Sequence, residues 1–133
     1  MSETSKEIYR LGMQGYCCSQ ILVKMGLDAK GSENPELLDA MGGLCGGLYS
    51  GLCCGTLTGA ACLLSLYDSK NASRMIRALV EWFQRTYTEA YGGISCEEII
   101  ENNSMNRVER CPRIMEETFE KCRELLAEIG YEV

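Results

Sequence analysis

The chain has 133 residues, 46% hydrophobic and 24% charged, so we expect one folded domain spanning residues 1–133. Its net charge of −6 disfavours nucleic acid as a partner, because phosphate binding needs a basic surface. No apolar run reaches the ~18 residues of a membrane span and the N-terminus lacks an apolar signal core, so we expect a cytoplasmic protein that makes no membrane contact.

The first third of the chain predicts three short helices. Residues 3–13 fit the first helix, and the second begins after Gly15. Gly26 has the position of a C-cap for this second helix. A third helix is expected to begin with Asn34 as its N-cap and Pro35 in its first turn.

A glycine-rich connection occupies the middle of the chain. The glycines of residues 42–51 end the third helix, and a fourth helix fits residues 54–67. Gly55 and Gly59 lie on one face of this helix, where each glycine costs about 1 kcal/mol relative to alanine. We therefore expect another backbone or a bound cofactor to lie close to this face.

The C-terminal part predicts three more helices. Residues 72–91 form a long amphipathic pattern, and Ser95 with Glu98 forms a capping box for a short helix. The last helix is expected over residues 111–129, with Pro112 in its first turn. Because no segment alternates like a strand, the sequence predicts an all-α, compact bundle of about six or seven helices with a glycine-rich central connection.

The chain has nine cysteines and no histidine. The lack of histidine excludes His-based triads, Cys–His dyads and mixed Cys/His zinc sites. In a reducing cytosol, this many cysteines favours metal binding or thiol redox chemistry. Cys62 and Cys122 lie in mid-helix on apolar faces and are expected to be small buried side chains.

Four other cysteines are predicted in the first turns of four helices: Cys18, Cys54, Cys96 and Cys111. A helix N-terminus offers free N–H groups and a partial positive charge, which favour thiolate and lower a cysteine pKa below its free value of about 8.5. The four sulfurs either meet at one point of the bundle or are unrelated thiols.

Four segments resemble, in this order and spacing, the C_GCAxxG_C_C family of redox-active proteins: "GYCCSQILVKMGL", "CGTLTGA", "YGGISCEEI" and "RCPRIMEETFEKCRELL". The resemblance extends from about Cys18 to the last helix. It implicates the same four cysteines, together with Gly55 and Gly59.

The chain departs from the family pattern at several positions. Thr56 stands where the motif has alanine, and the literal order Gly-Cys-Ala is replaced by Cys-Cys-Gly-Thr. Cys17, Cys45 and Cys53 are additional to the pattern, as alternative ligands or a resolving thiol.

Three functions fit this pattern, and the sequence does not decide whether the protein is an enzyme. The first is a redox or electron-transfer protein whose four thiolates hold an iron–sulfur cluster or another thiophilic metal, with Gly55 and Gly59 beside it. The second is a cofactor-free thiol–disulfide protein in which Cys54 attacks and Cys18 or Cys53 resolves. The third is a protein-binding module held by structural zinc. We expect a redox partner protein, and the composition allows a homodimer.

Overall fold

The computed structural model describes residues 2–133, which form seven α-helices and no strand, so the all-α prediction is confirmed. The helices are α1 (Glu3–Met13), α2 (Cys18–Lys30), α3 (Pro35–Met41), α4 (Gly55–Tyr67), α5 (Ala72–Tyr91), α6 (Cys96–Ile100) and α7 (Ser104–Ala127). None of these helices combines the length and apolar character needed to cross a membrane.

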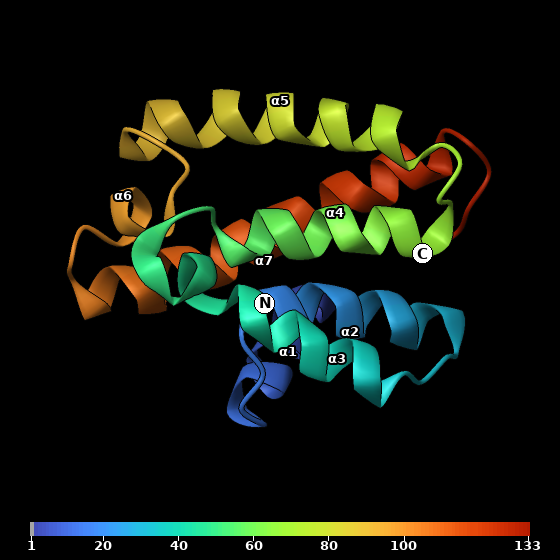
Figure 1. The fold of residues 1–133 in the computed structure, drawn as a ribbon, viewed down its shortest axis with the longest axis horizontal. Coiled ribbons are helices and arrows are strands. Elements are labelled where there is room, and N and C mark those ends of the chain that lie inside the picture. The colour runs from blue at the N-terminus through green and yellow to red at the C-terminus, as the bar shows by residue number, and fades with distance from the viewer. Residues whose placement is uncertain (1) are drawn as a thin grey trace.

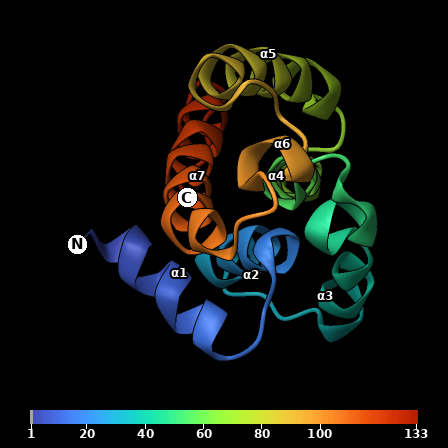
Figure 2. The same cartoon turned by 90° about the vertical axis from the view of Figure 1, so that its left-hand side faces the viewer.

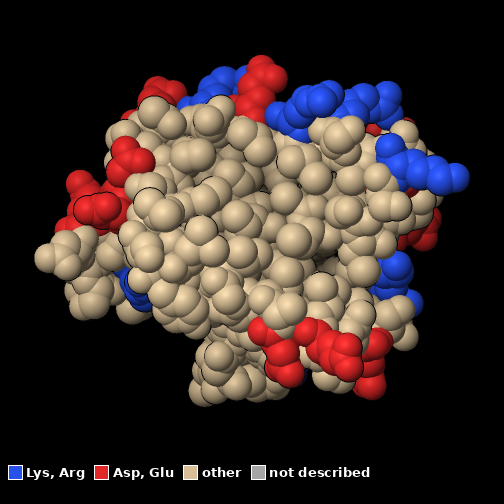
Figure 3. All heavy atoms as spheres, viewed as in Figure 1, with Lys and Arg blue, Asp and Glu red and all other residues tan. Residues whose placement is uncertain are grey.

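Helix α4 is the centre of the bundle, and α2, α5 and α7 pack around it (Figures 1 and 2). Its sequence is apolar on most sides, as expected for a helix with neighbours all round. The main core includes Leu63, Leu64, Phe83 and Leu126, none of them exposed. On the face viewed in Figure 1, charged side chains lie around the edge and leave an uncharged centre (Figure 3).

Several predicted helix ends are confirmed. The Asn34 side chain accepts a hydrogen bond from the backbone N–H of Leu37 at 3.1 Å, with Pro35 as the first residue of α3. Ser95 and Glu98 form the predicted capping box of α6. These ends were predictable because side-chain caps are local, and their signals lie within four residues.

The predicted end of α2 is wrong. The helix continues to Lys30 and ends at Gly31, whose φ of 71° is the left-handed conformation of a C-cap glycine. Gly26 lies inside the helix, where a Cβ atom would come within 2.9 Å of Leu63 Cγ. This glycine therefore permits α2 and α4 to approach closely.

The predicted start of α7 is also wrong. The helix begins at Ser104, capped by the Asn103 side chain, so that Pro112 lies in its interior and Cys111 is not in a first turn. An interior proline costs about 3 kcal/mol. Tertiary contacts support the additional turns: the Arg110 guanidinium donates a 2.7 Å hydrogen bond to the Ile99 carbonyl at the end of α6.

The glycine-rich connection contains a 3₁₀ turn (Gly42–Leu44) followed by a left-handed segment. Four successive residues from 46 to 49 have positive φ, including Leu48 at 64° and Tyr49 at 55°. The Leu52 carbonyl then accepts a 2.6 Å hydrogen bond from the N–H of Cys96. This bond holds the start of α6 beside the segment that leads into α4.

Candidate thiol site

Cys18 and Cys111 form the centre of the candidate site. Cys18 is the first residue of α2, and Cys111 lies on α7. Both side chains line one cavity, and the Cys111 thiol is the largest influence that lowers the pKa of Cys18 from 9.0 to about 7. Cys18 in turn raises the pKa of Cys111, and burial adds to this. Near neutral pH the pair therefore holds one thiolate and one thiol.

Two residues that the sequence reasoning did not select support the Cys18 thiolate. The Thr56 hydroxyl and the Arg107 charge both lower the pKa of Cys18. Thr56 is fully enclosed at the start of α4, with 1% of its surface exposed. Arg107 lies four residues before Cys111, on the same face of α7. That i, i+4 spacing is a sequence signal, but the last helix was predicted to begin only at residue 111, after Arg107.

Cys54 lies nearby but differs chemically. It is the N-cap of α4, one residue before the first turn in which it was predicted, and only 6% of its surface is exposed. Burial raises its pKa to about 11, and the charge on Cys18 adds to the shift. The expectation that a helix start would lower this pKa is wrong, because burial outweighs the hydrogen bonds from the N–H groups of Thr56 and Leu57.

Cys96 is the first residue of α6 and is a neighbour of Arg107. It lines a second cavity of about 550 Å³, to which Arg107 also contributes. Burial raises the pKa of Cys96, and the nearby Arg107 charge opposes this only in part. Cys96 is therefore within range of the Cys18 charge without sharing its cavity.

The Cys18–Cys111 pair opens into a cavity of about 690 Å³. Tyr9, Met13 and Tyr49 form an exposed apolar rim. No Asp or Glu lines this cavity, so Arg107 is the charged residue in its wall apart from the Cys18 thiolate. A volume of this size is typical of small-molecule sites.

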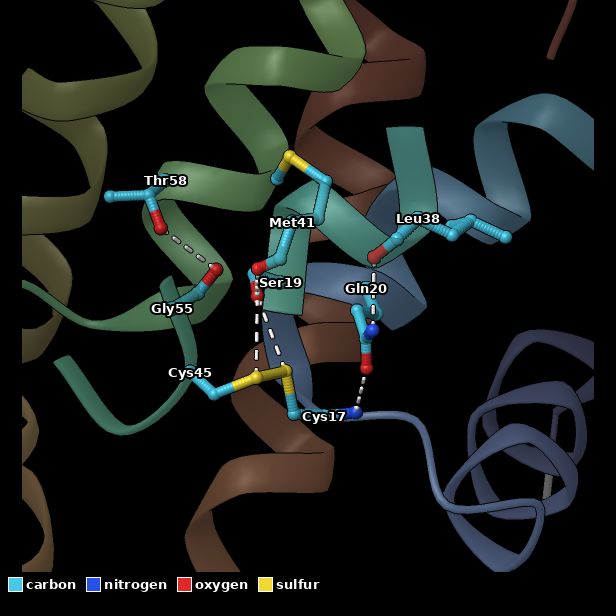
Figure 4. The surroundings of a disulfide bond; sticks show 8 residues. All are labelled: Cys17, Ser19, Gln20, Leu38, Met41, Cys45, Gly55 and Thr58. Atoms are coloured by element: carbon cyan, nitrogen blue, oxygen red, sulfur yellow. Dashed lines mark hydrogen bonds between the residues drawn. A yellow bond between two sulfur atoms is a disulfide. The ribbon is translucent and has the colours of Figure 1, made fainter. Parts of the chain in front are cut away.

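A disulfide between Cys17 and Cys45 lies in the wall of the same cavity (Figure 4). It connects the N-cap of α2 to the residue that follows the 3₁₀ turn. The Ser19 hydroxyl contacts Cys17 Sγ at 3.3 Å and donates a 2.8 Å hydrogen bond to the Met41 carbonyl. The sequence marked both cysteines only as additional to the family pattern, since their pairing depends on the path of the glycine-rich connection.

Gly55 and Gly59 both face α2. A Cβ atom at Gly59 would lie 2.7 Å from the Ser19 carbonyl oxygen, and one at Gly55 would lie 3.3 Å from the Leu44 carbonyl oxygen and 3.5 Å from the Ser19 backbone nitrogen. The close approach of two backbones, one of the two alternatives that the sequence left open, accounts for both glycines. A cofactor-binding role for them stays a prediction.

The four cysteines predicted as metal ligands do not form a ready metal site. The charge of a Cys18 thiolate raises the pKa of each of the other three, so the four lie in one region of the bundle. Within residues 2–133, no three Cys, Asp or Glu side chains are arranged to hold a metal ion. The iron–sulfur cluster and the zinc site therefore stay predictions.

The mid-helix cysteines lie away from this site. Cys122 has no exposed surface, and its thiol donates to the Ala60 carbonyl at 3.9 Å, as expected of a small buried side chain. Burial raises its pKa to about 12. Cys62 is only partly buried, because α4 leaves this position near the molecular surface.

Comparison with known proteins supports a redox assignment. A family model described as "Putative redox-active protein (C_GCAxxG_C_C)" matches residues 16–125, which include α2 to α6 and most of α7. No curated protein and no solved structure is similar enough to this chain to give a match. The matched range contains Cys18, Cys54, Cys96 and Cys111, and the chain therefore belongs to the C_GCAxxG_C_C family.

Proposed function

We propose that this protein is a thiol–disulfide redox protein in which Cys18 and Cys111 are the exchanging pair. The observation that carries the proposal is that Cys18 and Cys111 line the same open cavity, where the Cys111 thiol lowers the pKa of Cys18 to about 7. A thiol with a pKa near the ambient pH is the most effective nucleophile for exchange.

The reaction transfers two electrons. The Cys18 thiolate attacks one sulfur of a substrate disulfide, which breaks that bond, forms a mixed disulfide and releases the other substrate sulfur as a thiolate that takes up a proton. Cys111 then loses its proton to solvent and attacks Cys18 Sγ. The second substrate sulfur leaves and is protonated. The substrate disulfide has become two thiols, and Cys18 and Cys111 have become a disulfide.

Residues around the pair favour the first step. Thr56 and Arg107 stabilise the Cys18 thiolate, and the cavity gives a substrate access to it. Cys54, the attacking thiol expected from the sequence, is protonated at neutral pH because it is buried. We therefore place the attacking thiol at Cys18 and assign Cys54 to the packing beneath the pair.

The test is equilibration with a redox buffer of reduced and oxidised dithiothreitol, which carries no charge near pH 7. We expect two thiols to be lost together, and peptide mass spectrometry to locate the new disulfide at Cys18–Cys111. Cys18→Ser and Cys111→Ser should each abolish it, whereas Cys62→Ser, at a distant surface position, should not. Oxidation that never joins Cys18 to Cys111, or that persists in Cys18→Ser, would refute the proposal.

Metal analysis after oxygen-free purification tests the alternative predicted from the sequence. Iron with acid-labile sulfide, lost on Cys18→Ser and Cys111→Ser, would favour the iron–sulfur cluster. One equivalent of zinc with the same dependence would favour the structural zinc site. Metal-free protein that still forms the Cys18–Cys111 disulfide is the result expected for a thiol–disulfide protein.

A further inference from the structure

The wall of the cavity beside Cys18 carries an arginine, although the protein as a whole is acidic. The chain has a net charge of −6, yet no Asp or Glu lines this cavity and Arg107 does. Among residues 2–133, Arg107 forms no ion pair with a carboxylate, whereas Arg110 and Arg113 on the same helix pair with Glu101 and Glu117. The guanidinium is therefore available to a ligand that enters the cavity.

The rest of the wall is apolar and aromatic. Tyr9, Met13 and Tyr49 are exposed by 45%, 90% and 76%, which is unusual for large hydrophobic side chains. A volume of about 690 Å³ accommodates a small organic molecule. A guanidinium is planar and presents parallel N–H donors that match a carboxylate.

We propose that the cavity binds a small organic disulfide that carries a carboxylate, with Arg107 holding the carboxylate and Cys18 attacking the disulfide. This inference rests on the thiol–disulfide function proposed above, and it names the substrate class of that site. The attack forms a mixed disulfide between Cys18 and one half of the substrate and releases the other half as a thiolate. Arg107 takes no part in the bond exchange and acts as a positioning residue.

Two aromatic disulfides, one with carboxylates and one without, test the proposal. 5,5′-Dithiobis(2-nitrobenzoate) carries two carboxylates, and 4,4′-dithiodipyridine is uncharged at pH 9. The protein is prepared with Cys53→Ser and Cys111→Ser, so that the most exposed other thiol is absent and the mixed disulfide on Cys18 is trapped. Working at pH 9 keeps Cys18 ionised, so a change in its titration does not affect the comparison.

We measure the second-order rate constant of Cys18 with each reagent. The readout is the ratio of the constant for 5,5′-dithiobis(2-nitrobenzoate) to the constant for 4,4′-dithiodipyridine. We expect Arg107→Gln to lower the ratio about fivefold, as for the loss of one unit charge about 4 Å from the carboxylate in water, and Arg107→Lys to restore part of it. Arg113→Gln removes an arginine from the same helix outside the cavity and should leave the ratio unchanged. An unchanged ratio in Arg107→Gln, or an equal fall in Arg113→Gln, would overturn the proposal.

Ionic strength gives a second measurement on the protein with Arg107 in place. Attraction by Arg107 means that added NaCl lowers the ratio, because salt screens the carboxylate from the guanidinium. If the overall charge of −6 controlled the encounter, salt would instead raise the ratio by screening repulsion. The direction in which salt changes the ratio therefore tests the proposal even if Arg107→Gln does not fold. The dithiothreitol test is independent of it, since that reagent carries no carboxylate.

Discussion

The influence of Cys111 on the pKa of Cys18 gives a quantitative prediction about reactivity. The pKa of Cys18 is lowered from 9.0 to about 7, and Cys111 is the largest cause. Two pKa units are a hundredfold change in the ratio of thiolate to thiol, so about half of Cys18 is ionised at pH 7 instead of about one per cent. Cys111→Ala removes the donor, and we expect the Cys18 pKa to rise by about one unit or more.

The assay is the rate of Cys18 alkylation by iodoacetamide across pH 5 to 10, with the labelled peptide identified by mass spectrometry. Because the thiolate is the nucleophile, the rate should rise as pH increases through about 7 and then level off. Cys111→Ser retains a hydroxyl donor of similar size and should keep the midpoint near that of the unmodified protein. A midpoint of 8.5 or higher before mutation, or one that does not move in Cys111→Ala, would refute the reasoning.

Three further predictions concern the surroundings of the pair. Thr56→Ala, which restores the alanine of the family motif, removes a donor and should raise the alkylation midpoint of Cys18, whereas Thr56→Ser should not. Cys45→Ser opens a disulfide whose cysteines are 28 residues apart, and urea unfolding should show a loss of about 3.5 kcal/mol in the free energy of unfolding; an unchanged value would contradict the chain-entropy argument. Gly59→Ala places a Cβ 2.7 Å from a carbonyl oxygen of α2 and should cost about 1–3 kcal/mol in the same assay. Gly12→Ala, where no atom lies within 4 Å, is the matched control and should stabilise α1 by up to about 1 kcal/mol; equal effects at the two glycines would argue against close packing.

The helices with strong local signals could be predicted from the sequence. Residues 3–13 and 72–91 have the bounds of α1 and α5, because both segments have a clear 3.6-residue period and Gly92 ends the second one. The helix ends were predicted wrongly at residues whose type can either mark a helix end or occur inside a helix. Gly26 ends no helix because its function is close packing, and Pro112 starts none because contacts from α6 stabilise the turns before it.

The candidate site was only partly predictable, because several of its properties depend on the folded chain and not on local sequence. Cys18, Cys54 and Cys96 are at helix starts, as the sequence indicates, but burial is a property of the folded chain and raises the pKa values of Cys54 and Cys96. The Cys17–Cys45 disulfide depends on a left-handed segment that no local pattern specifies. Arg107 was missed because the start of α7 was placed too late.

Cys17 and Cys18 are consecutive residues, so one peptide unit joins the two sulfur pairs of the site. Cys17 is covalently bonded to Cys45, and Cys18 is the thiolate whose pKa is lowered by Cys111. Breaking the bond at Cys17 frees the N-cap of α2, and with it one restraint on the direction in which the Cys18 side chain leaves the helix. The state of the Cys17–Cys45 bond is therefore one of the factors that set the position of the Cys18 sulfur.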